Sequence, residues 1–201
     1  MKGRGCGVGT LFVNNHPYAV FCHERLREYP ITGGASTYRI STWNAKLAKY
    51  AITLLKEMNW EGVAMVEFKL NQESGEAKLI EVNGRFWGSL ALAINAGVDF
   101  PFLLYSSVVE KKIEKDLFNT YKVGIHQRWL IPGDILWLFS LIRRREGILS
   151  GFKEFFSSSS KDDVICLNDP LPLFGALLSL IDLLLQVLRG KLNICGEVIV
   201  Q

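Results

Sequence analysis

One stretch of the chain carries four polar residues suited to metal and phosphate chemistry: Glu67, Glu81, Asn83 and Arg85. Carboxylate and amide oxygens are the ligands that hard cations prefer, and Mg²⁺ typically takes one or two carboxylates together with substrate phosphates. An arginine holds a phosphate through two parallel hydrogen bonds. These residue types indicate a site for a metal-bound polyphosphate, provided that the fold brings the four side chains together.

Two strands must position these residues. Apolar residues alternate in VAMVEFKL (63–70) and in AKLIEVN (77–83), as they do in half-buried strands. A hairpin that keeps the apolar faces together has its turn centred on Ser74. The three-residue loop then ends at Gly75, where a left-handed conformation is needed.

This register brings two negative charges together. The predicted pairs are Val66 with Val82, Phe68 with Ile80, and Glu67 with Glu81. Like charges directly opposite each other destabilise a sheet. At about 5 Å and an effective dielectric constant near 20, the repulsion between two carboxylates is roughly 3 kcal/mol. A divalent cation between Glu67 and Glu81 would turn that repulsion into attraction.

Other interpretations of the pair remain open at this stage. Two glutamates on a solvated strand face are common, and Lys69 on the same face could neutralise one of them. Protonation of one carboxyl group, or a nearby lysine or arginine, would relieve the repulsion without any metal. The pattern alone therefore supports a metal site and an ordinary solvated strand about equally.

Two short helices are predicted directly after the polar cluster. Ser89 is a suitable cap for a helix over 90–96, which stops at Gly97. Asp99 is a suitable cap for a second helix, with Pro101 in its first turn. The second strand, the polar residues and a helix start are therefore contiguous in the chain, as they are at the edge of many active sites.

The blocks MVEFK and LIEVNGRFWGS together resemble the metal-binding end of the ATP-grasp superfamily. The upstream stretch GRGCGVGTLFVNNHPYAVFCHERLREYPITGGAST is similar to the segment after the nucleotide hinge in predicted ATP-dependent carboxylate–amine ligases of that superfamily. The resemblance implies that Glu67, Glu81 and Asn83 are metal ligands, with Glu81 shared by two ions. It implies that Arg85 contacts the transferred phosphoryl group and assists catalysis.

The same resemblance implies further site residues and a reaction. Arg27, Gly33 and Gly34 would lie near the triphosphate, and Ser89 would touch the acid substrate. ATP, with Mg²⁺ or Mn²⁺, would phosphorylate a carboxylate to an acyl phosphate. An amine would then displace the phosphate. The expected partners are thus a small-molecule carboxylate and an amine.

The chain departs from the superfamily pattern at its start. The subdomain and hinge that normally precede this segment would lie before residue 1. The resemblance therefore implies that this chain contributes only about half of the nucleotide clamp. A partner chain or a homo-oligomer would then supply the rest. The alternative is a non-catalytic remnant that binds a partner chain, or a membrane surface, through its apolar helices.

The expected fold class is α+β: the C-terminal half of an ATP-grasp domain, with an antiparallel sheet flanked by helices and a helical C-terminal extension. The expected domains are 1–110 for the ATP-grasp part and 111–201 for the extension. Further predicted elements are strands over 11–13, 18–22 and 121–129, helices over 44–58 and 135–141 (the latter capped by Asp134), a loop over 27–38 and a charged connector over 111–116.

Composition limits the remaining possibilities. A net charge of +3 over 201 residues is too small to indicate nucleic-acid binding. The four cysteines, Cys6, Cys22, Cys166 and Cys195, are far apart, which favours reduced thiols over a zinc site. The first residues do not resemble a signal peptide, so a cytoplasmic location is expected. The apolar segment 171–188 contains Asp182, which favours a helix packed on protein over one in a membrane, although contact with a membrane surface stays open.

Overall fold

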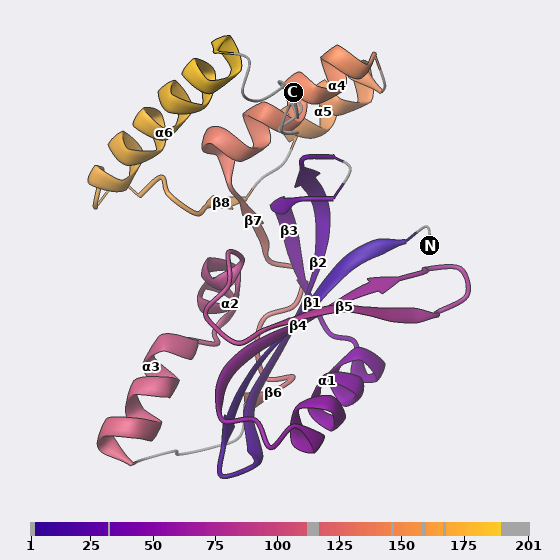
Figure 1. Ribbon diagram of the computed structural model, residues 1–201, viewed down its shortest axis with the longest axis vertical. Helices are drawn as coiled ribbons and strands as arrows, with labels where there is room; N and C mark the ends of the chain where they lie inside the picture. The colour runs from indigo at the N-terminus through magenta and orange to yellow at the C-terminus, as the bar shows by residue number, and fades with distance from the viewer. Residues whose placement is uncertain are drawn as a thin grey trace. The chain divides into compact units, whose positions relative to one another are not determined.

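The computed structural model describes residues 3–31, 33–111, 117–145, 147–157, 160–166 and 168–189 (Figure 1). Contacts within the chain divide it into two compact units: unit 1, Met1–Arg25 with Ile40–Ile125, and unit 2, Leu26–Arg39 with His126–Gln201. Strands β2 and β3 each begin in one unit and end in the other. The domain division expected from the sequence, 1–110 and 111–201, stays a prediction.

Unit 1 is built on an antiparallel sheet with the strand order β5-β4-β1-β2, and β6 pairs in parallel with β2. Its strands are β1 (Arg4–Val13), β2 (His16–Tyr29), the end of β3 (Ala35–Thr42), β4 (Gly62–Leu70), β5 (Ala77–Asn83) and β6 (Leu117–Phe118). Its helical elements are α1 (Ala45–Glu57), α2 (Leu90–Ala96), α3 (Phe100–Tyr105) and η1 (Ser106–Glu110). The predicted α+β class, an antiparallel sheet flanked by helices, is confirmed.

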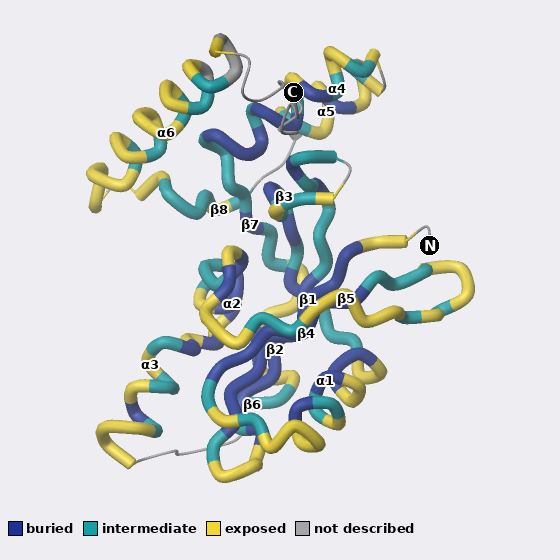
Figure 2. Tube along the Cα trace, in the orientation of Figure 1, coloured by how far each residue is buried: buried dark blue, intermediate teal, exposed yellow. Residues whose placement is uncertain are grey.

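Strand alternation gives this sheet two apolar faces, and each is covered by helices. One face contributes Val8, Val20 and Val66 to a core that contains Leu47 and Leu55 of α1. The opposite face packs against α2 and α3, through these residues: Leu11, Phe21, Val63, Met65, Leu92, Ala93 and Phe100. Figure 1 shows α1 on one side of the strands and α2 with α3 on the other. Figure 2 shows the central strands as buried and the tip of the β4–β5 hairpin as exposed.

The predicted helices of unit 1 are confirmed, together with most of their caps. The Oδ1 atom of Asn44 accepts a hydrogen bond of 3.1 Å from the backbone N–H of Leu47 at the start of α1. Asp99 caps α3 in the same way, at 3.0 Å from the N–H of Phe102. Gly97 ends α2 with a φ of 111°, the left-handed conformation that glycine adopts without strain.

The β4–β5 hairpin differs from the prediction at its turn. Leu70 pairs with Ala77, so the loop is longer than three residues. The Oδ1 atom of Asn71 holds it by accepting hydrogen bonds from two backbone N–H groups of the loop, at 2.9 and 3.2 Å. Gly75 has a φ of 67°, so the left-handed glycine is confirmed.

Two other sequence expectations for this part of the fold were wrong. The predicted loop over 27–38 contains the end of β2 and the start of β3, because the strands continue past the polar residues that suggested a loop. The predicted strand over 121–129 is reduced to β7 (His126–Arg128). Tyr121 lies outside any strand, and its hydroxyl links two backbone segments. It donates to the carbonyl of Thr42 at 2.6 Å and accepts from the N–H of Cys22 at 2.8 Å.

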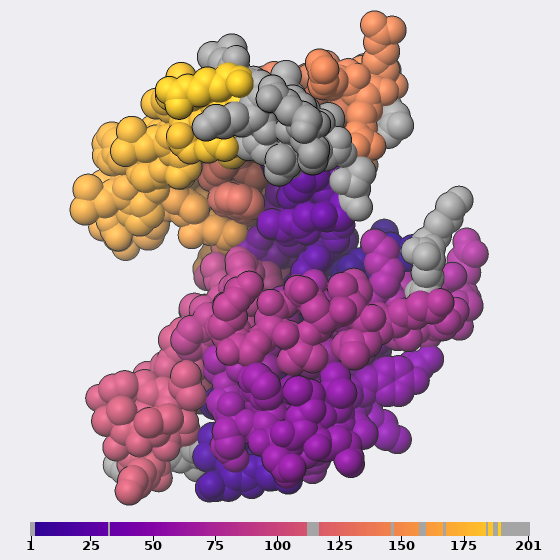
Figure 3. Space-filling model, viewed as in Figure 1, coloured from indigo at the N-terminus to yellow at the C-terminus, as the bar shows by residue number. Residues whose placement is uncertain are grey.

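Unit 2 contains, besides its parts of β2 and β3, mostly helices. Its elements are β7, η2 (Leu130–Asp134), α4 (Ile135–Arg144), α5 (Ile148–Ser157), β8 (Lys161–Asp162) and α6 (Leu171–Leu188). A small core forms around Tyr29, Leu136 and Trp137. Helix α6 lies at the surface of this unit (Figure 3, orange to yellow), with Leu171, Phe174 and Leu178 exposed.

In the described part of the chain, no single helix is long and apolar enough to cross a membrane. Helix α2 and the segment Phe100–Glu110 reach that length and hydropathy only together, and the two are bent by 89° relative to each other. Among the described cysteines, Cys6 and Cys22 are buried free thiols and Cys166 is an exposed one. Cys195 and most of the predicted connector, 112–116, lie outside the described residues.

Candidate active site

Backbone pairing aligns four residues of unit 1 across four strands. Gly7 of β1 pairs with His23 of β2 on one side and with Glu67 of β4 on the other, and Glu67 pairs with Glu81 of β5. Paired residues on neighbouring strands project from the same face of a sheet. The predicted juxtaposition of Glu67 and Glu81 is therefore confirmed, on the face that also packs against α2.

The register is less regular just beyond this pair. A β-bulge between Glu67 and Phe68 makes Phe68 pair with Leu79 rather than with the predicted Ile80. Alternation in the sequence cannot reveal such a bulge, because one extra residue on one strand leaves the apolar pattern on both sides intact. The predicted pairing of Val66 with Val82 is confirmed.

Asn83 links the two carboxylates. Its Nδ2 atom donates to Oε1 of Glu81 at 2.7 Å and lies 3.5 Å from Oε1 of Glu67. Glu67 is buried, with 6% of its surface exposed, whereas Glu81 is exposed. Asn83 thus contacts both of the other residues predicted as metal ligands. One of them, Glu67, is a carboxylate whose burial makes an opposite charge nearby necessary.

Arg25 supplies that opposite charge, and it was not among the residues predicted from the sequence. Its Nη2 atom pairs with Oε1 of Glu67, and both side chains are mostly buried. Arg25 follows His23 by two residues, so alternation would have placed it on the site face. The signal was missed because the predicted strand ended at Cys22, whereas β2 continues to Tyr29.

Arg85, the predicted phosphate contact, lies just beyond the end of β5. Its side chain is exposed, and its Nη1 atom donates to the carbonyl of Phe86 at 3.1 Å. The structure thus places Arg85 two residues from Asn83 in the chain but directs its guanidinium toward its own neighbour. Its phosphate-binding role stays a prediction.

Ser89, the predicted acid-substrate contact, is buried at the start of α2 and makes no side-chain cap bond. Its Oγ atom lies 3.1 Å from Nε2 of His23 instead. Two glycines make room for this arrangement. A Cβ atom at Gly7 would lie 2.2 Å from the His23 ring, and one at Gly9 would lie 2.3 Å from the ring of Trp87.

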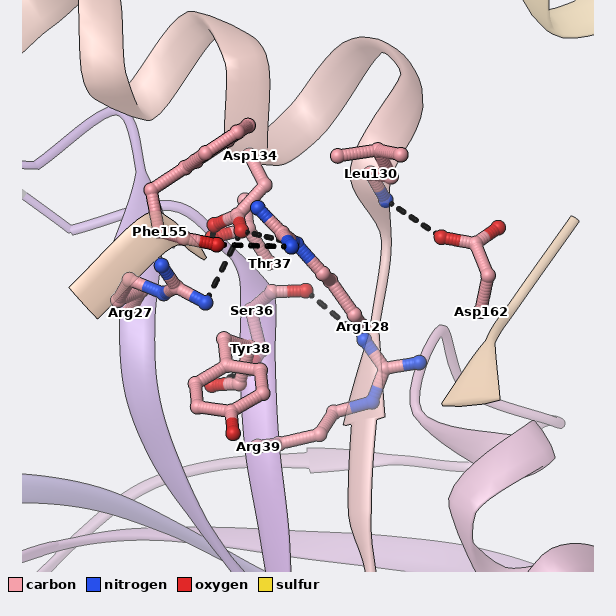
Figure 4. Close-up of polar contacts among 10 residues, drawn as sticks. All are labelled: Arg27, Ser36, Thr37, Tyr38, Arg39, Arg128, Leu130, Asp134, Phe155 and Asp162. Atoms are coloured by element: carbon pink, nitrogen blue, oxygen red, sulfur yellow. Dashed lines mark hydrogen bonds and ion pairs between the residues drawn. The ribbon is translucent and has the colours of Figure 1, made fainter. Parts of the chain in front are cut away.

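The remaining predicted residues belong to unit 2, where Asp134 collects three side-chain donors (Figure 4). Thr37 donates to it at 3.0 Å, Nε of Arg128 at 2.6 Å, and Nη2 of Arg27 pairs with it at 3.0 Å. Asp134 is the N-cap residue of α4, as predicted, but its side chain makes no cap hydrogen bond. Burial raises the pKa of the Asp134 carboxyl, and the two guanidiniums oppose that increase.

Arg27 is 5% exposed, and its guanidinium lies 4.2 Å from the ring centre of Tyr38 and 4.7 Å from that of Trp137. Burial lowers the pKa of Arg27, and Asp134 opposes this. Gly33 is exposed with a φ of 130°, and a Cβ atom at Gly34 would lie 2.2 Å from the carbonyl oxygen of Tyr29. A nucleotide-binding role for Arg27, Gly33 and Gly34 stays a prediction.

The donor set around Glu67 fits a hard divalent cation. It offers two carboxylates and one amide. Mg²⁺ usually binds few protein ligands and completes its coordination shell with phosphate and water oxygens. Turning the amide of Asn83 would present its oxygen in place of its NH₂ group. The described residues hold no group of three or more His, Cys, Asp or Glu side chains arranged for a metal, so this site would depend on ligands from a polyphosphate.

Comparison with protein families gives one match. The family described as ATP-grasp in the biosynthetic pathway with Ter operon matches residues 21–130. The matched range contains Arg25, Glu67, Glu81, Asn83 and Arg85. No curated protein matches the chain significantly.

Several solved structures are similar to part of this chain. The biotin carboxylase of Campylobacter jejuni, solved as a β-γ-ATP complex, is 14% identical, with a TM-score of 0.50 over 63% of this chain and 29% of that one. Rhizobium etli pyruvate carboxylase is 14% identical, with a TM-score of 0.48 over 61% of this chain and 13% of that one. The biotin carboxylase domain of Hydrogenobacter thermophilus 2-oxoglutarate carboxylase is 12% identical, with a TM-score of 0.47 over 61% of this chain and 28% of that one. This chain therefore spans less than a third of each of these proteins.

Proposed function

Because the chain belongs to the ATP-grasp family of the biosynthetic pathway with Ter operon, we propose that it acts in an ATP- and Mg²⁺-dependent carboxylate–amine ligase. The observation that carries this proposal is the pairing of Glu67 with Glu81, with the amide of Asn83 between their carboxylates. The proposed substrates are a small-molecule carboxylate and an amine, and the proposed location is the cytoplasm.

The proposed reaction has two steps. A carboxylate oxygen of the acid attacks the γ-phosphorus of ATP, the bond to the β-phosphate oxygen breaks, and ADP leaves. The amine then attacks the acyl carbon, phosphate leaves, and the amine loses a proton to the surrounding water. Phosphoryl transfer needs charge neutralisation and positioning more than covalent help, and bound Mg²⁺ would supply that neutralisation.

Each side chain of the site has a role in this proposal. Glu67, Glu81 and Asn83 would hold the metal, with Glu81 as the ligand shared by two ions because it is the more exposed carboxylate. Arg85 would turn from the carbonyl of Phe86 toward the transferred phosphoryl group, which its exposure permits. Ser89, fixed by His23, would help to position the acid substrate.

Titration with MgATP tests the metal role. We expect Glu81→Gln to weaken MgATP binding, measured by calorimetry, at least tenfold, because it removes one of two charged ligands. The control is Glu76→Gln, which removes the same charge from the exposed loop end of the same hairpin. Equal MgATP affinity for Glu81→Gln and the unmodified protein would contradict the proposal.

Hydroxylamine trapping tests the reaction class. An acyl phosphate formed in the first step reacts with hydroxylamine to give a hydroxamate and phosphate. The expected result, with a panel of small carboxylic acids, is an ATP-dependent hydroxamate that Glu81→Gln does not form. ATP hydrolysis that depends on the acid but gives no hydroxamate would rule out the acyl phosphate.

A second candidate function is partner binding without catalysis. It is supported by the exposed apolar residues of α6, which include Leu171, Phe174 and Leu178 at helical spacing. The chain could then contribute to an assembly of two chains or contact a membrane surface. Substitution of these three residues by glutamine would abolish such binding in a copurification or vesicle-flotation assay and leave MgATP affinity unchanged.

A further inference from the structure

The ion pair between Arg25 and Glu67 spans a strand. Arg25 belongs to β2 and Glu67 to β4, and β1 runs between them. Strands in a sheet lie about 4.8 Å apart, so the two backbones are about 10 Å from each other. The Arg25 side chain therefore extends across β1 to reach the carboxylate.

Glycines on β1 contribute no side chains between Arg25 and Glu67. Gly5, Gly7 and Gly9 alternate along this strand, and in the register Gly5 and Gly7 pair with Lys69 and Glu67 of β4. The face of β1 between Arg25 and Glu67 thus carries no side chains at these positions. Glycine weakens a strand interior, so a run of alternating glycines indicates that something must lie close to the backbone here. At Gly7 this is the ring of His23, and at Gly9 it is the ring of Trp87.

The guanidinium contacts one of the two carboxylate oxygens through which Glu67 would bind a metal. Both Nη2 of Arg25 and Nδ2 of Asn83 point to the same atom, Oε1 of Glu67. A divalent cation at that oxygen would stand beside a positive guanidinium in a mostly buried place, where repulsion between like charges is strong. Arg25 and a metal ion therefore compete for Glu67.

We propose that Arg25 is an exchangeable counter-cation of the metal site: it neutralises Glu67 while no divalent ion is bound, and it leaves Glu67 when an ion binds. This inference rests on the proposed metal site. It gives Arg25 a function that a permanent structural ion pair lacks, because the pair must open for the ion to enter.

Mn²⁺ alone, titrated into the full chain and followed by electron paramagnetic resonance, tests the competition. Arg25→Gln removes the competing charge, so we expect it to bind Mn²⁺ about tenfold more tightly. Arg25→Lys keeps the charge, so its Mn²⁺ affinity should stay within threefold of the unmodified protein. The matched control is Arg4→Gln, which removes one positive charge from a surface ion pair with Glu24 on the same sheet; it should change Mn²⁺ affinity less than twofold.

A measurement on the unmodified protein removes any dependence on how well Arg25→Gln folds. The Nε–H signal of Arg25 in nitrogen–proton correlation spectra, assigned as the signal missing from Arg25→Lys, should shift on addition of Mg²⁺ and stay unchanged with K⁺. A signal that does not move at saturating Mg²⁺ would overturn the proposal. So would an Arg25→Gln protein that binds Mn²⁺ no more tightly than the unmodified one.

Glu67→Gln separates this inference from the proposed function. If it abolishes Mn²⁺ binding while Arg25→Gln leaves the affinity unchanged, the metal site stands and the counter-cation role fails. If Mn²⁺ binds none of these proteins, or binds Glu67→Gln as well as the unmodified protein, both the metal site and the role of Arg25 fail.

Discussion

The ring of His23 on β2 fills the space that a side chain at Gly7 on β1 would need. A Cβ atom at Gly7 would lie 2.2 Å from Cε1 of that ring, and the two residues are partners in the backbone register. His23 is 1% exposed, and its Nε2 atom lies 3.1 Å from Oγ of Ser89. The glycine thus fixes where the histidine lies, and the histidine fixes the serine at the start of α2.

Gly7→Ala should therefore destabilise unit 1. The added methyl group overlaps a ring that is 1% exposed, and overpacking of this kind costs about 1–3 kcal/mol. Urea unfolding followed by circular dichroism measures the loss. Gly88→Ala is the control, because nothing lies within 4 Å of its Cβ position, and it should change the free energy of unfolding by less than about 0.5 kcal/mol. Equal stability of the two variants would show that the His23 ring is not held as described.

Asp134→Asn should be among the most destabilising single-atom changes in unit 2. Asp134 has no exposed surface and pairs with Arg27 and Arg128, so its neutralisation leaves two mostly buried guanidiniums without their counter-charge. Removing one member of a buried ion pair costs about 3–5 kcal/mol. The measurement is the free energy of unfolding in urea, and Glu73→Gln in the exposed hairpin loop is the control. A loss below about 1 kcal/mol would mean that water reaches the cluster.

Alkaline pH should weaken the fold through two buried thiols. Burial raises the pKa of Cys6 from 9.0 to about 12 and that of Cys22 to about 11. The folded state therefore holds these protons more tightly than the unfolded state does, so the stabilisation is complete below about pH 9 and is lost as pH rises toward the folded values. Between pH 8 and pH 10 the free energy of unfolding should fall by about 1 kcal/mol per thiol.

Unfolding in urea at both pH values measures this decrease. Replacing Cys6 and Cys22 together by alanine should make the decrease with pH smaller, whereas Cys166→Ala, at an exposed thiol, should leave it unchanged. A decrease that is the same in all three proteins would assign it to other groups.

The parts of the site that lie on one hairpin were predictable. Alternation of apolar residues set the faces of β4 and β5, and the need to bury those faces fixed the register that pairs Glu67 with Glu81. The helices after the hairpin were predictable for a similar reason, because the Asp99 cap of α3 and the Gly97 stop of α2 act on the nearest backbone groups. The bulge after Glu67 was not, since it leaves the alternation on either side unchanged.

The sequence by itself thus determined the local chemistry: that Glu67 and Glu81 are opposite each other, where helices begin and end, and that two carboxylates require a counter-charge. Only the tertiary structure decided which group supplies that charge in this chain, Arg25 for Glu67, and that the side chain of Asp134, at the N-cap of α4, pairs with two arginines. The physical reason is range. Periodicity and caps depend on neighbours a few residues away, whereas Arg25 and Glu67, or Arg27 and Asp134, meet only after strands and helices far apart in sequence have packed together.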